Sequence, residues 1–304
     1  MLGSVLLHLL VLLLFAPLLL GVITKTKAAF AGRVGAPLLL PYYDLARLWR
    51  KGFVLSQTTS WVFLAGPAVG LVVPLLAALL LPLGPLAAPL SFRGDLILFV
   101  YLFALGRFFT ATAALDTGSS FEGMGAAREV SFSCLAEPTL FFVLLALARC
   151  GNSLTLNGML GGHLAALWAS TTGAALALLV VCLLVLLLVE NSRIPFDDPN
   201  THLELTMVHE VMVLDHSGPA LALIHYGAAL KLMVLGALIV RLLLPFETGQ
   251  LALDLTFFLV GLLLLAVVVG VIESTMARLR LPRVPQVLVG TSLLSLFALV
   301  LILR

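Results

Sequence analysis

Charged side chains are scarce in this sequence, and their scarcity excludes an ordinary water-soluble protein. Asp, Glu, Lys and Arg make up 11% of the 304 residues, whereas apolar residues make up 62%. Soluble domains carry about 25% charged residues, which cover their surface with groups that water solvates. The mean hydropathy of +1.18 points the same way. We therefore expect an integral membrane protein.

Cysteine is rare too, and no charge of one sign accumulates. The three cysteines, Cys134, Cys150 and Cys182, stand apart and form no CxxC pair. We therefore expect this chain to bind neither zinc nor an iron–sulfur cluster itself. The net charge of +2 gives no indication of nucleic-acid binding, and no basic run is long enough to suggest it.

Strand-like alternation of polar and apolar residues is absent, and Leu and Ala dominate, which favours helices over a β-barrel. A helix needs about 20 apolar residues to cross the hydrocarbon of a bilayer. The sequence predicts an all-α membrane protein, a single domain over residues 1–304 with about eight transmembrane helices. The expected spans are roughly 2–24, 61–82, 95–115, 130–149, 165–189, 218–244, 253–273 and 284–303. Positive charge follows the first apolar run rather than preceding it, so we interpret that run as a span and not as a signal peptide.

Lys and Arg in the connections predict the orientation, because cytoplasmic loops carry an excess of them. The expected polar cytoplasmic loops are 25–60, 116–129, 190–217 and 274–283, and both termini are then expected outside, with the chain in the cell inner membrane. The cytoplasmic side receives eleven basic residues: Lys25, Lys27, Arg33, Arg47, Arg50, Lys51, Arg128, Arg193, Arg278, Arg280 and Arg283. The other side receives four: Arg93, Arg149, Arg241 and Arg304.

Residues 41–52 predict a short helix outside the spans. Pro41 stands where a first helical residue is expected, and Leu45, Leu48 and Trp49 fall on one face with charges opposite. This amphipathic pattern is typical of a helix that lies in the membrane interface, or beneath a partner, on the cytoplasmic side.

The densest polar segment, ENSRIPFDDPNTHLELTMVHEVMVLDHSG at residues 190–218, holds six of the fifteen carboxylates. A polar loop between two spans is often only a solvated connection. Here apolar residues interleave with the charges, which indicates a face to bury. We interpret the segment as a loop coupling network, in which the two arginines hold carboxylates in place. Its candidate residues are Glu190, Arg193, Asp197, Asp198, Glu204, Glu210 and Asp215, with Arg128 and Glu129 from the preceding loop. A metal site at His202, His209 and His216 is less favoured than a solvated or partner-facing role, because no cysteine is nearby.

Three further ionisable residues, Arg107, Glu137 and Lys231, fall inside expected spans. Each costs about 2.5–3.5 kcal/mol at mid-membrane on insertion scales, so we expect all three to face the bundle interior. One hypothesis is a structural ion pair that sets helix register. The other, which we favour because three helices and both signs of charge are involved, is an intramembrane relay that connects to Glu190.

Two blocks of sequence resemble a known family. ENSRIPFDDPNTHLEL followed by DHSG is similar to the signature of complex I subunit 1, the membrane subunit that anchors the peripheral arm. GMGAAREVSFSCLAE is similar to a second block of that family, in which an arginine and a carboxylate lie nine residues apart, as Arg128 and Glu137 do. The matching residues of the first block are Glu190, Asn191, Arg193, Pro195, Phe196, Asp197, Glu204, Leu205, Ser217 and Gly218.

Departures from the quinone-reducing branch point to another branch. Asn200 and His202 stand where that branch has glutamates, and Gly227 stands where a glutamate is usual, with Lys231 one turn later. DTGSSFEGMGAARE and LAEP look more like the membrane subunit of energy-converting group 4 NiFe hydrogenases, the branch of formate hydrogenlyase subunit 4 and hydrogenase-4 component C. These departures argue against quinone binding.

The resemblance implies a non-catalytic membrane-anchor and coupling subunit of a complex I-like oxidoreductase complex. It would dock a hydrogenase-like peripheral arm and link electron transfer to proton or sodium translocation. The implied partners are hydrogenase-like large and small subunits, an iron–sulfur ferredoxin-like subunit and antiporter-like membrane subunits. Ni–Fe and iron–sulfur centres would lie in those partners, and this chain would bind no cofactor.

Three alternatives remain at this point. One is a quinone-binding subunit of an NADH:quinone-type oxidoreductase, with a headgroup pocket under the helix at 41–52. Another is a stand-alone ion transporter, which is less favoured because the sequence has no duplicated half. The third is a passive anchor whose buried charges only pair with one another.

Overall fold

The computed structural model describes residues 2–198, 207–245 and 248–304, and within these ranges it contains helices and no β-strand. Eight of the described helices are long and apolar enough to cross a membrane. The prediction of an all-α membrane protein with about eight spans is therefore confirmed. The eight are α1 (Leu2–Phe30), α3 (Trp61–Leu80), α4 (Asp95–Asp116), α5 (Ser120–Gly151), α8 (Gly173–Glu190), α9 (Gly218–Leu243), α10 (Leu251–Thr275) and α11 (Val284–Leu303).

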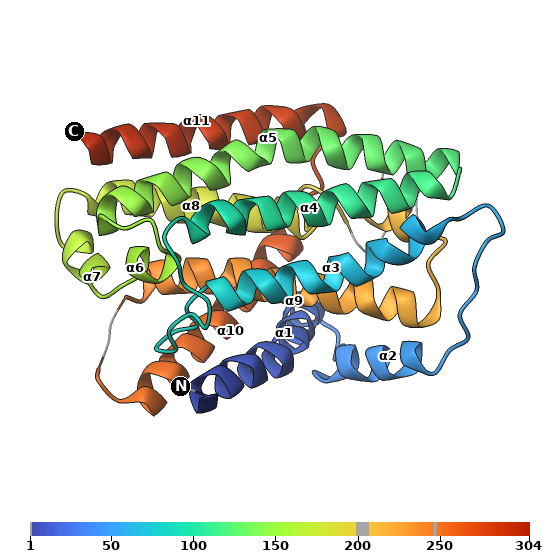
Figure 1. The fold of residues 1–304 in the computed structure, drawn as a ribbon, viewed down its shortest axis with the longest axis horizontal. Helices are drawn as coiled ribbons and strands as arrows, with labels where there is room; N and C mark the ends of the chain where they lie inside the picture. The colour runs from blue at the N-terminus through green and yellow to red at the C-terminus, as the bar shows by residue number, and fades with distance from the viewer. Residues whose placement is uncertain (1, 199–206, 246–247) are drawn as a thin grey trace.

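Shorter elements in the described part of the chain connect the spans. They are α2 (Leu40–Trp49), α6 (Leu156–Met159), α7 (His163–Trp168) and the 3₁₀ helices η1 (Glu210–Val213) and η2 (Leu281–Arg283). The predicted amphipathic helix is α2, which has Pro41 in its first turn and no fully buried residue. It lies apart from the bundle core, at the right of Figure 1.

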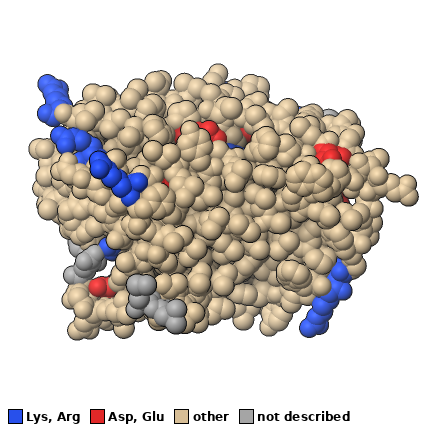
Figure 2. Space-filling view, in the orientation of Figure 1, with Lys and Arg blue, Asp and Glu red and all other residues tan. Residues whose placement is uncertain are grey.

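The long helices run roughly parallel to one axis (Figure 1). α3 packs against α4 and α9, α11 packs against α5 and α8, and α1 packs against α9 and α10. We call the end at which α1, α4, α8 and α10 finish the α2 end, and the opposite end, where both termini lie, the terminal end. In Figure 2 most charged side chains of the visible face lie at its two ends; apart from a small acidic patch near the upper middle, the surface between the ends is almost uncharged, as a membrane-spanning surface requires.

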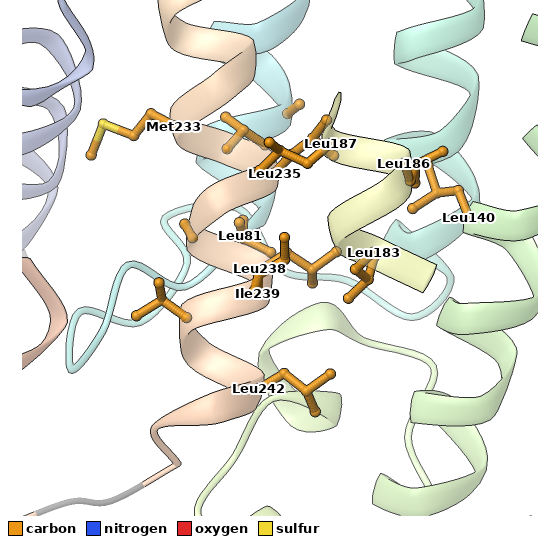
Figure 3. Packing of buried hydrophobic residues seen from close by; sticks show 14 of the residues in the cluster. Leu81, Leu140, Leu183, Leu186, Leu187, Met233, Leu235, Leu238, Ile239 and Leu242 are labelled. Carbon is orange, nitrogen blue, oxygen red and sulfur yellow. The ribbon is translucent and has the colours of Figure 1, made fainter. Parts of the chain in front are cut away.

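The middle of the bundle is packed through α9, whose most apolar window is 67% buried, the largest share among the described spans. Leu235 and Leu238 of α9 point toward Leu187 and Leu183 of α8 (Figure 3). On the other side of α8, Leu186 meets Leu140 of α5 (Figure 3). Because lipid is as apolar as leucine, close packing rather than exclusion from water holds these helices together.

α1 contains Pro17, which has no N–H to donate to the carbonyl of Leu13. The hydroxyl of Tyr226 on α9 donates to that carbonyl at 2.9 Å, and the hydroxyl of Tyr42 on α2 donates to the next one, Leu14. Burial raises the pKa of Tyr42, so this hydroxyl remains a donor at neutral pH. The turn of α1 before Pro17 is thus an attachment point of α2.

The structure corrects several expected boundaries. α5 begins at Ser120, so most of the expected loop 116–129 is helical, and α1 continues to Phe30 rather than ending near residue 24. The span expected from residue 165 begins at Gly173, after α7. Hydropathy identifies the part of a helix that crosses hydrocarbon, whereas good helix formers such as Ala, Glu, Lys and Arg extend the helix beyond it.

Candidate functional site

Ionisable side chains from four helices meet inside the bundle. The guanidinium of Arg107 on α4 donates one hydrogen bond to Glu190, the last residue of α8, and another to Glu137 on α5. The ammonium of Lys231 on α9 lies 2.8 Å from the second carboxylate oxygen of Glu190. We call these four residues the central cluster; its two cations and two carboxylates balance.

The central cluster lies deep in the membrane-spanning part. Arg107 stands near the middle of α4, and its side chain is 11% exposed; that of Glu190 is 7% exposed. At this depth an unpaired charge would cost several kcal/mol, which the ion pairs offset. The side chain of Glu137 is 40% exposed, so it is the member that opens toward the outside of this chain.

Glu190 reaches this depth because α8 is short. α8 has 18 residues and α4 has 22, and at about 1.5 Å per residue α8 is several ångströms shorter. The chain then turns at Ser192, which has a positive φ of 50°. The side-chain amide of Asn191 donates to the carbonyl of Leu187 at 2.8 Å. Non-helical backbone at this depth is tolerated because it lies within protein and lines cavities.

The approach of α3 to α9 explains why α9 carries glycine beside the central cluster. Pro74 lacks the N–H that would bond to the carbonyl of Gly70, so this carbonyl is free to face α9. A Cβ at Gly227 would collide with it. No side chain therefore fits where a glutamate is usual in the family that the sequence resembles, and Lys231, one turn along, supplies the ionic group.

A cavity of about 100 Å³ adjoins the central cluster. At about 30 Å³ for each water molecule it has room for about three. Besides apolar residues of α3 and α9, its polar lining side chains are Arg107, Thr110, Glu129, Glu190, Asn191, Ser192, His209, His216 and Lys231. It therefore connects the central cluster with the described part of the segment before α9.

His216 lies against this cavity on the side of the α2 end. Its ring stacks on Phe63 of α3 with 4.0 Å between centroids, and the residue is 6% exposed. Burial lowers the pKa of His216 to about 4, so the ring is neutral at pH 7. Its Nδ1 is buried and has no hydrogen-bond partner among the residues that the structure describes.

A second cavity, of about 530 Å³, lies between α1, α2 and α9. Asn191 and Ser192 line both cavities, so the turn after Glu190 separates them. Apolar residues of α1 such as Leu20 and Ile23 form part of its wall. Its charged lining residues are Lys27, Asp44, Arg47, Lys51, Arg193 and Glu210. The position agrees with the pocket that the quinone alternative requires under residues 41–52.

Asp197 has contacts that the sequence did not predict. One oxygen accepts a hydrogen bond from Arg278, beyond α10, at 2.8 Å, and the other accepts from the backbone N–H groups of Val208 and His209, each at 3.1 Å. The carboxylate of Asp197 therefore fastens the segment that precedes η1 to the end of α10.

The two arginines expected to hold loop carboxylates have other partners. Arg193 pairs with Glu273 of α10, at 3.3 Å, and Arg128 donates to the carbonyl of Met207, at 3.0 Å, and to the sulfur of Met124. Within the described residues no ion pair joins either arginine to one of the expected loop carboxylates, because the end of α10 brings its own charge to this segment; the expected pairing stays a prediction.

The remaining predicted loop residues are dispersed. Glu129 lines the first cavity and Glu210 the second, and the backbone N–H of Asp198 donates to Asp197. The backbone N–H of Asp215 donates to Glu122 at 3.2 Å. Glu204 and His202 lie outside the described residues. The structure thus brings Glu190 to Arg107, Glu137 and Lys231, places Glu129 in the lining of the adjoining cavity, and places the other described loop residues farther away.

Sequence reasoning missed three buried carboxylates, Asp95, Glu122 and Glu273; Asp95, at the start of α4, accepts a hydrogen bond from the backbone N–H of Leu156 at 2.8 Å. The side chain of Glu273 is 0% exposed and lies 2.7 Å from Lys27 of α1 as well as near Arg193. Glu122, in the first turn of α5, is also buried. The sequence contains only a weak indication that these carboxylates are buried. Glu273 ends an apolar run and so resembles a solvated residue at the end of a span, and Glu122 lies in an expected loop.

No three His, Cys, Asp or Glu side chains in the described ranges are placed so that they could hold a metal ion. Of the three histidines before α9, His209 lines both cavities and His216 stacks on Phe63. The ionisable side chains of the central cluster can exchange protons and ion-pair partners.

Comparison with known proteins identifies relatives along the whole chain. The family described as NADH dehydrogenase matches residues 3–303. Hydrogenase-4 component C of Escherichia coli (strain K12) is 35% identical over 276 residues, covering 89% of this chain and 86% of that protein. Formate hydrogenlyase subunit 4 of the same organism is 31% identical over 286 residues, or 91% of each chain.

More distant relatives share part of the sequence or only the fold. An NADH-quinone oxidoreductase subunit of Bordetella avium (strain 197N) is 27% identical over 195 residues, covering 61% of this chain and 54% of that protein. A chain in the structure of the membrane-bound sulfane sulfur reductase, an archaeal respiratory membrane complex, matches with a TM-score of 0.83 at 18% identity. That match covers 99% of both chains and shows a shared fold.

Proposed function

This chain belongs to the NADH dehydrogenase family, and from that premise we propose that it is the membrane-anchor and coupling subunit of a complex I-like, energy-converting hydrogenase assembly. The resemblance predicted from two sequence blocks is confirmed at the level of the family. Relatives named as hydrogenase and formate hydrogenlyase components, each aligned over most of this chain, support the hydrogenase branch.

The observation that carries the coupling role is the sharing of Arg107 between Glu190 and Glu137. When Glu190 takes up a proton, Arg107 and Lys231 lose their shared carboxylate, and Arg107 remains paired with Glu137. The central cluster therefore has two charge arrangements that differ by one proton, as a switch requires. The adjoining cavity connects it to the α2 end, and the exposure of Glu137 leaves this residue accessible to a partner in the membrane.

Docking of a soluble redox arm is assigned to the α2 end. This end combines exposed apolar side chains, such as Trp49 and Val54, with the basic residues Arg47, Arg50 and Lys51 in and just after α2, a composition that suits a protein interface. The excess of Lys and Arg in its connections supports a cytoplasmic location, with both termini outside the inner membrane. Hydrogenase-like large and small subunits, an iron–sulfur subunit and antiporter-like subunits are the proposed partners, and they carry the Ni–Fe and iron–sulfur centres.

Glu190→Gln in the intact complex, reconstituted into vesicles, tests this function. We expect assembly and electron transfer to persist while ion movement per electron falls by about tenfold or more, because leaving a buried ion pair uncompensated costs about 3–5 kcal/mol. Asp254→Asn is the control, since Asp254 lies at the terminal end, outside the central cluster, where it accepts a hydrogen bond from the hydroxyl of Thr248. Wild-type ion movement in the Glu190→Gln complex would rule out the coupling role.

The second cavity favours one alternative, a quinone-binding subunit. Its volume of about 530 Å³ and its apolar wall on α1 suit an amphiphilic ring compound. Electron transfer to an added quinone by the purified complex would support this function, provided that enlarging the apolar wall by Leu20→Trp abolishes it. Hydrogen evolution with no response to quinone supports the hydrogenase function instead.

A further inference from the structure

The segment after Glu190 is fastened to the end of α10 at three successive points. Arg193 pairs with Glu273 at 3.3 Å, the backbone N–H of Leu279 donates to the carbonyl of Pro195 at 2.8 Å, and Arg278 binds Asp197 at 2.8 Å. Hydrogen bonds within residues 187–197 make the same segment compact: the N–H of Arg193 donates to Leu188 at 2.8 Å. Residues 273–279, which we call the mount, thus hold the turn after Glu190 in place through these three interactions.

Glu273 is the deepest part of this mount. Its side chain is completely buried, and it accepts both Arg193 and Lys27, the latter at 2.7 Å. Removing the carboxylate would leave two cations in the walls of the second cavity without their shared partner, which is strongly destabilising for buried charges. The burial and the two-fold pairing are more than a solvated helix end needs.

We propose that Glu273 is a positioning residue for the central cluster: by holding Arg193, it sets where the carboxylate of Glu190 lies between Arg107 and Lys231. Only Asn191 and Ser192 separate Arg193 from Glu190. A shift of Arg193 therefore also moves the end of α8. The ion pair of Glu190 with Lys231, at 2.8 Å, requires that the carboxylate of Glu190 keeps its position to within a few tenths of an ångström. This inference rests on the proposed coupling role of Glu190.

The arrangement also gives α10 a role. α10 is among the less enclosed spans, with 28% of its apolar window buried, and it contacts α1 and α9. Lys27 belongs to α1 and Arg193 to the turn after α8, so Glu273 joins a peripheral pair of helices to the central cluster. Movement of α10 against a neighbouring subunit would change the central cluster through Glu273.

The test is Glu273→Gln in the intact complex, with two measurements. Hydrogen–deuterium exchange of peptides over residues 188–198 reports the placement of the turn without any need for activity. Ion movement per electron in vesicles reports the central cluster. We expect exchange of the amides of 191–197 to rise by about tenfold or more as the segment opens locally, and ion movement per electron to fall while electron transfer continues.

Two neighbouring lysines of α1 supply the matched controls. Lys27→Gln removes one partner of Glu273 and keeps the pair with Arg193, so we expect the same changes at smaller amplitude. The ammonium of Lys25 bonds to the carbonyl of Val34 instead, at 2.6 Å, and Lys25→Gln should change neither measurement. Lys27→Arg, which retains a cation, should restore both. If the Glu273→Gln complex does not assemble, Lys27→Gln and Lys27→Arg carry the test.

Unchanged exchange in Glu273→Gln would overturn the inference, whatever the function of the chain. Faster exchange with normal ion movement would overturn the positioning role if Glu190→Gln blocks ion movement. If Glu190→Gln also leaves ion movement intact, the proposed function fails and the positioning role fails with it. Faster exchange together with a lower ratio of ions to electrons, absent in Lys25→Gln, supports the inference.

Discussion

Lys231 of α9 and Glu190 of α8 form an ion pair of 2.8 Å, and the side chain of Glu190 is almost fully buried. Glu190 ends its helix inside the membrane-spanning bundle, and Lys231 approaches from a helix that has no room for a side chain one turn earlier, at Gly227. The pair is therefore a product of helix length and close packing together. Its partner Arg107 then connects it to Glu137.

Lys231→Met tests whether this pair takes part in ion movement. Methionine keeps the length and apolar stem of the side chain but leaves Glu190 with Arg107 alone. We expect the complex to assemble and ion movement per electron to fall by on the order of tenfold, because a buried carboxylate loses one of two partners. Lys231→Arg, which retains the charge, should keep most of the activity. Equal ion movement in Lys231→Met and wild-type vesicles would contradict the role.

Gly227→Ala should destabilise the protein, because a Cβ there collides with the carbonyl of Gly70. Overpacking of this kind costs about 1–3 kcal/mol. Gly70→Ala is a matched control on the facing helix, since a Cβ at Gly70 meets no atom within 4 Å. The thermal unfolding midpoint in detergent is the measurement. We expect it to fall for Gly227→Ala and to stay the same or rise for Gly70→Ala; the reverse order would show that the approach of α3 to α9 is looser.

Tyr226→Phe removes the hydroxyl that donates to Leu13 at the bend of α1. Pro17 has already taken away the helical donor, so the carbonyl would lose its partner at a cost of about 0.5–1.5 kcal/mol. The control is Tyr101→Phe, at an exposed position on α4. We expect a lower unfolding midpoint only for Tyr226→Phe. Equal midpoints for the two variants would mean that the carbonyl finds another donor.

Because His216 is buried in its neutral form, we expect the free energy of unfolding to fall in acid. An unperturbed histidine has a pKa of about 6.5, and burial lowers the pKa of His216 to about 4 in the folded chain. The unfolded chain therefore binds the proton more readily, so this contribution is fully present above pH 6.5 and is lost as the pH falls toward 4. His216→Phe, which can still stack on Phe63, should flatten the dependence of the unfolding midpoint on pH over that interval. Parallel curves for the two proteins would disprove the assignment.

Some of the site was predictable because membrane burial is costly. Arg107, Glu137 and Lys231 each stand in a run of apolar residues. A charge that faces lipid is costly, so each of the three helices must turn its charge toward the bundle interior, and the sequence therefore predicts that the charges approach one another. The partner of Arg193 was not predictable in this way. Glu273 lies far along the chain, and its position at the end of an apolar run resembles that of an ordinary solvated residue.

The sequence by itself determined that the chain crosses the membrane in about eight helices, because backbone groups in hydrocarbon must bond within their own helix and this requirement is local. It also determined that a few charges would have to seek one another. Only the tertiary structure decided which charges meet: Arg107 shared by two carboxylates, Glu273 shared by two cations, and Asp197 bound by Arg278. Ion pairs act over a few ångströms, and where helices end and bend decides which side chains come within that range.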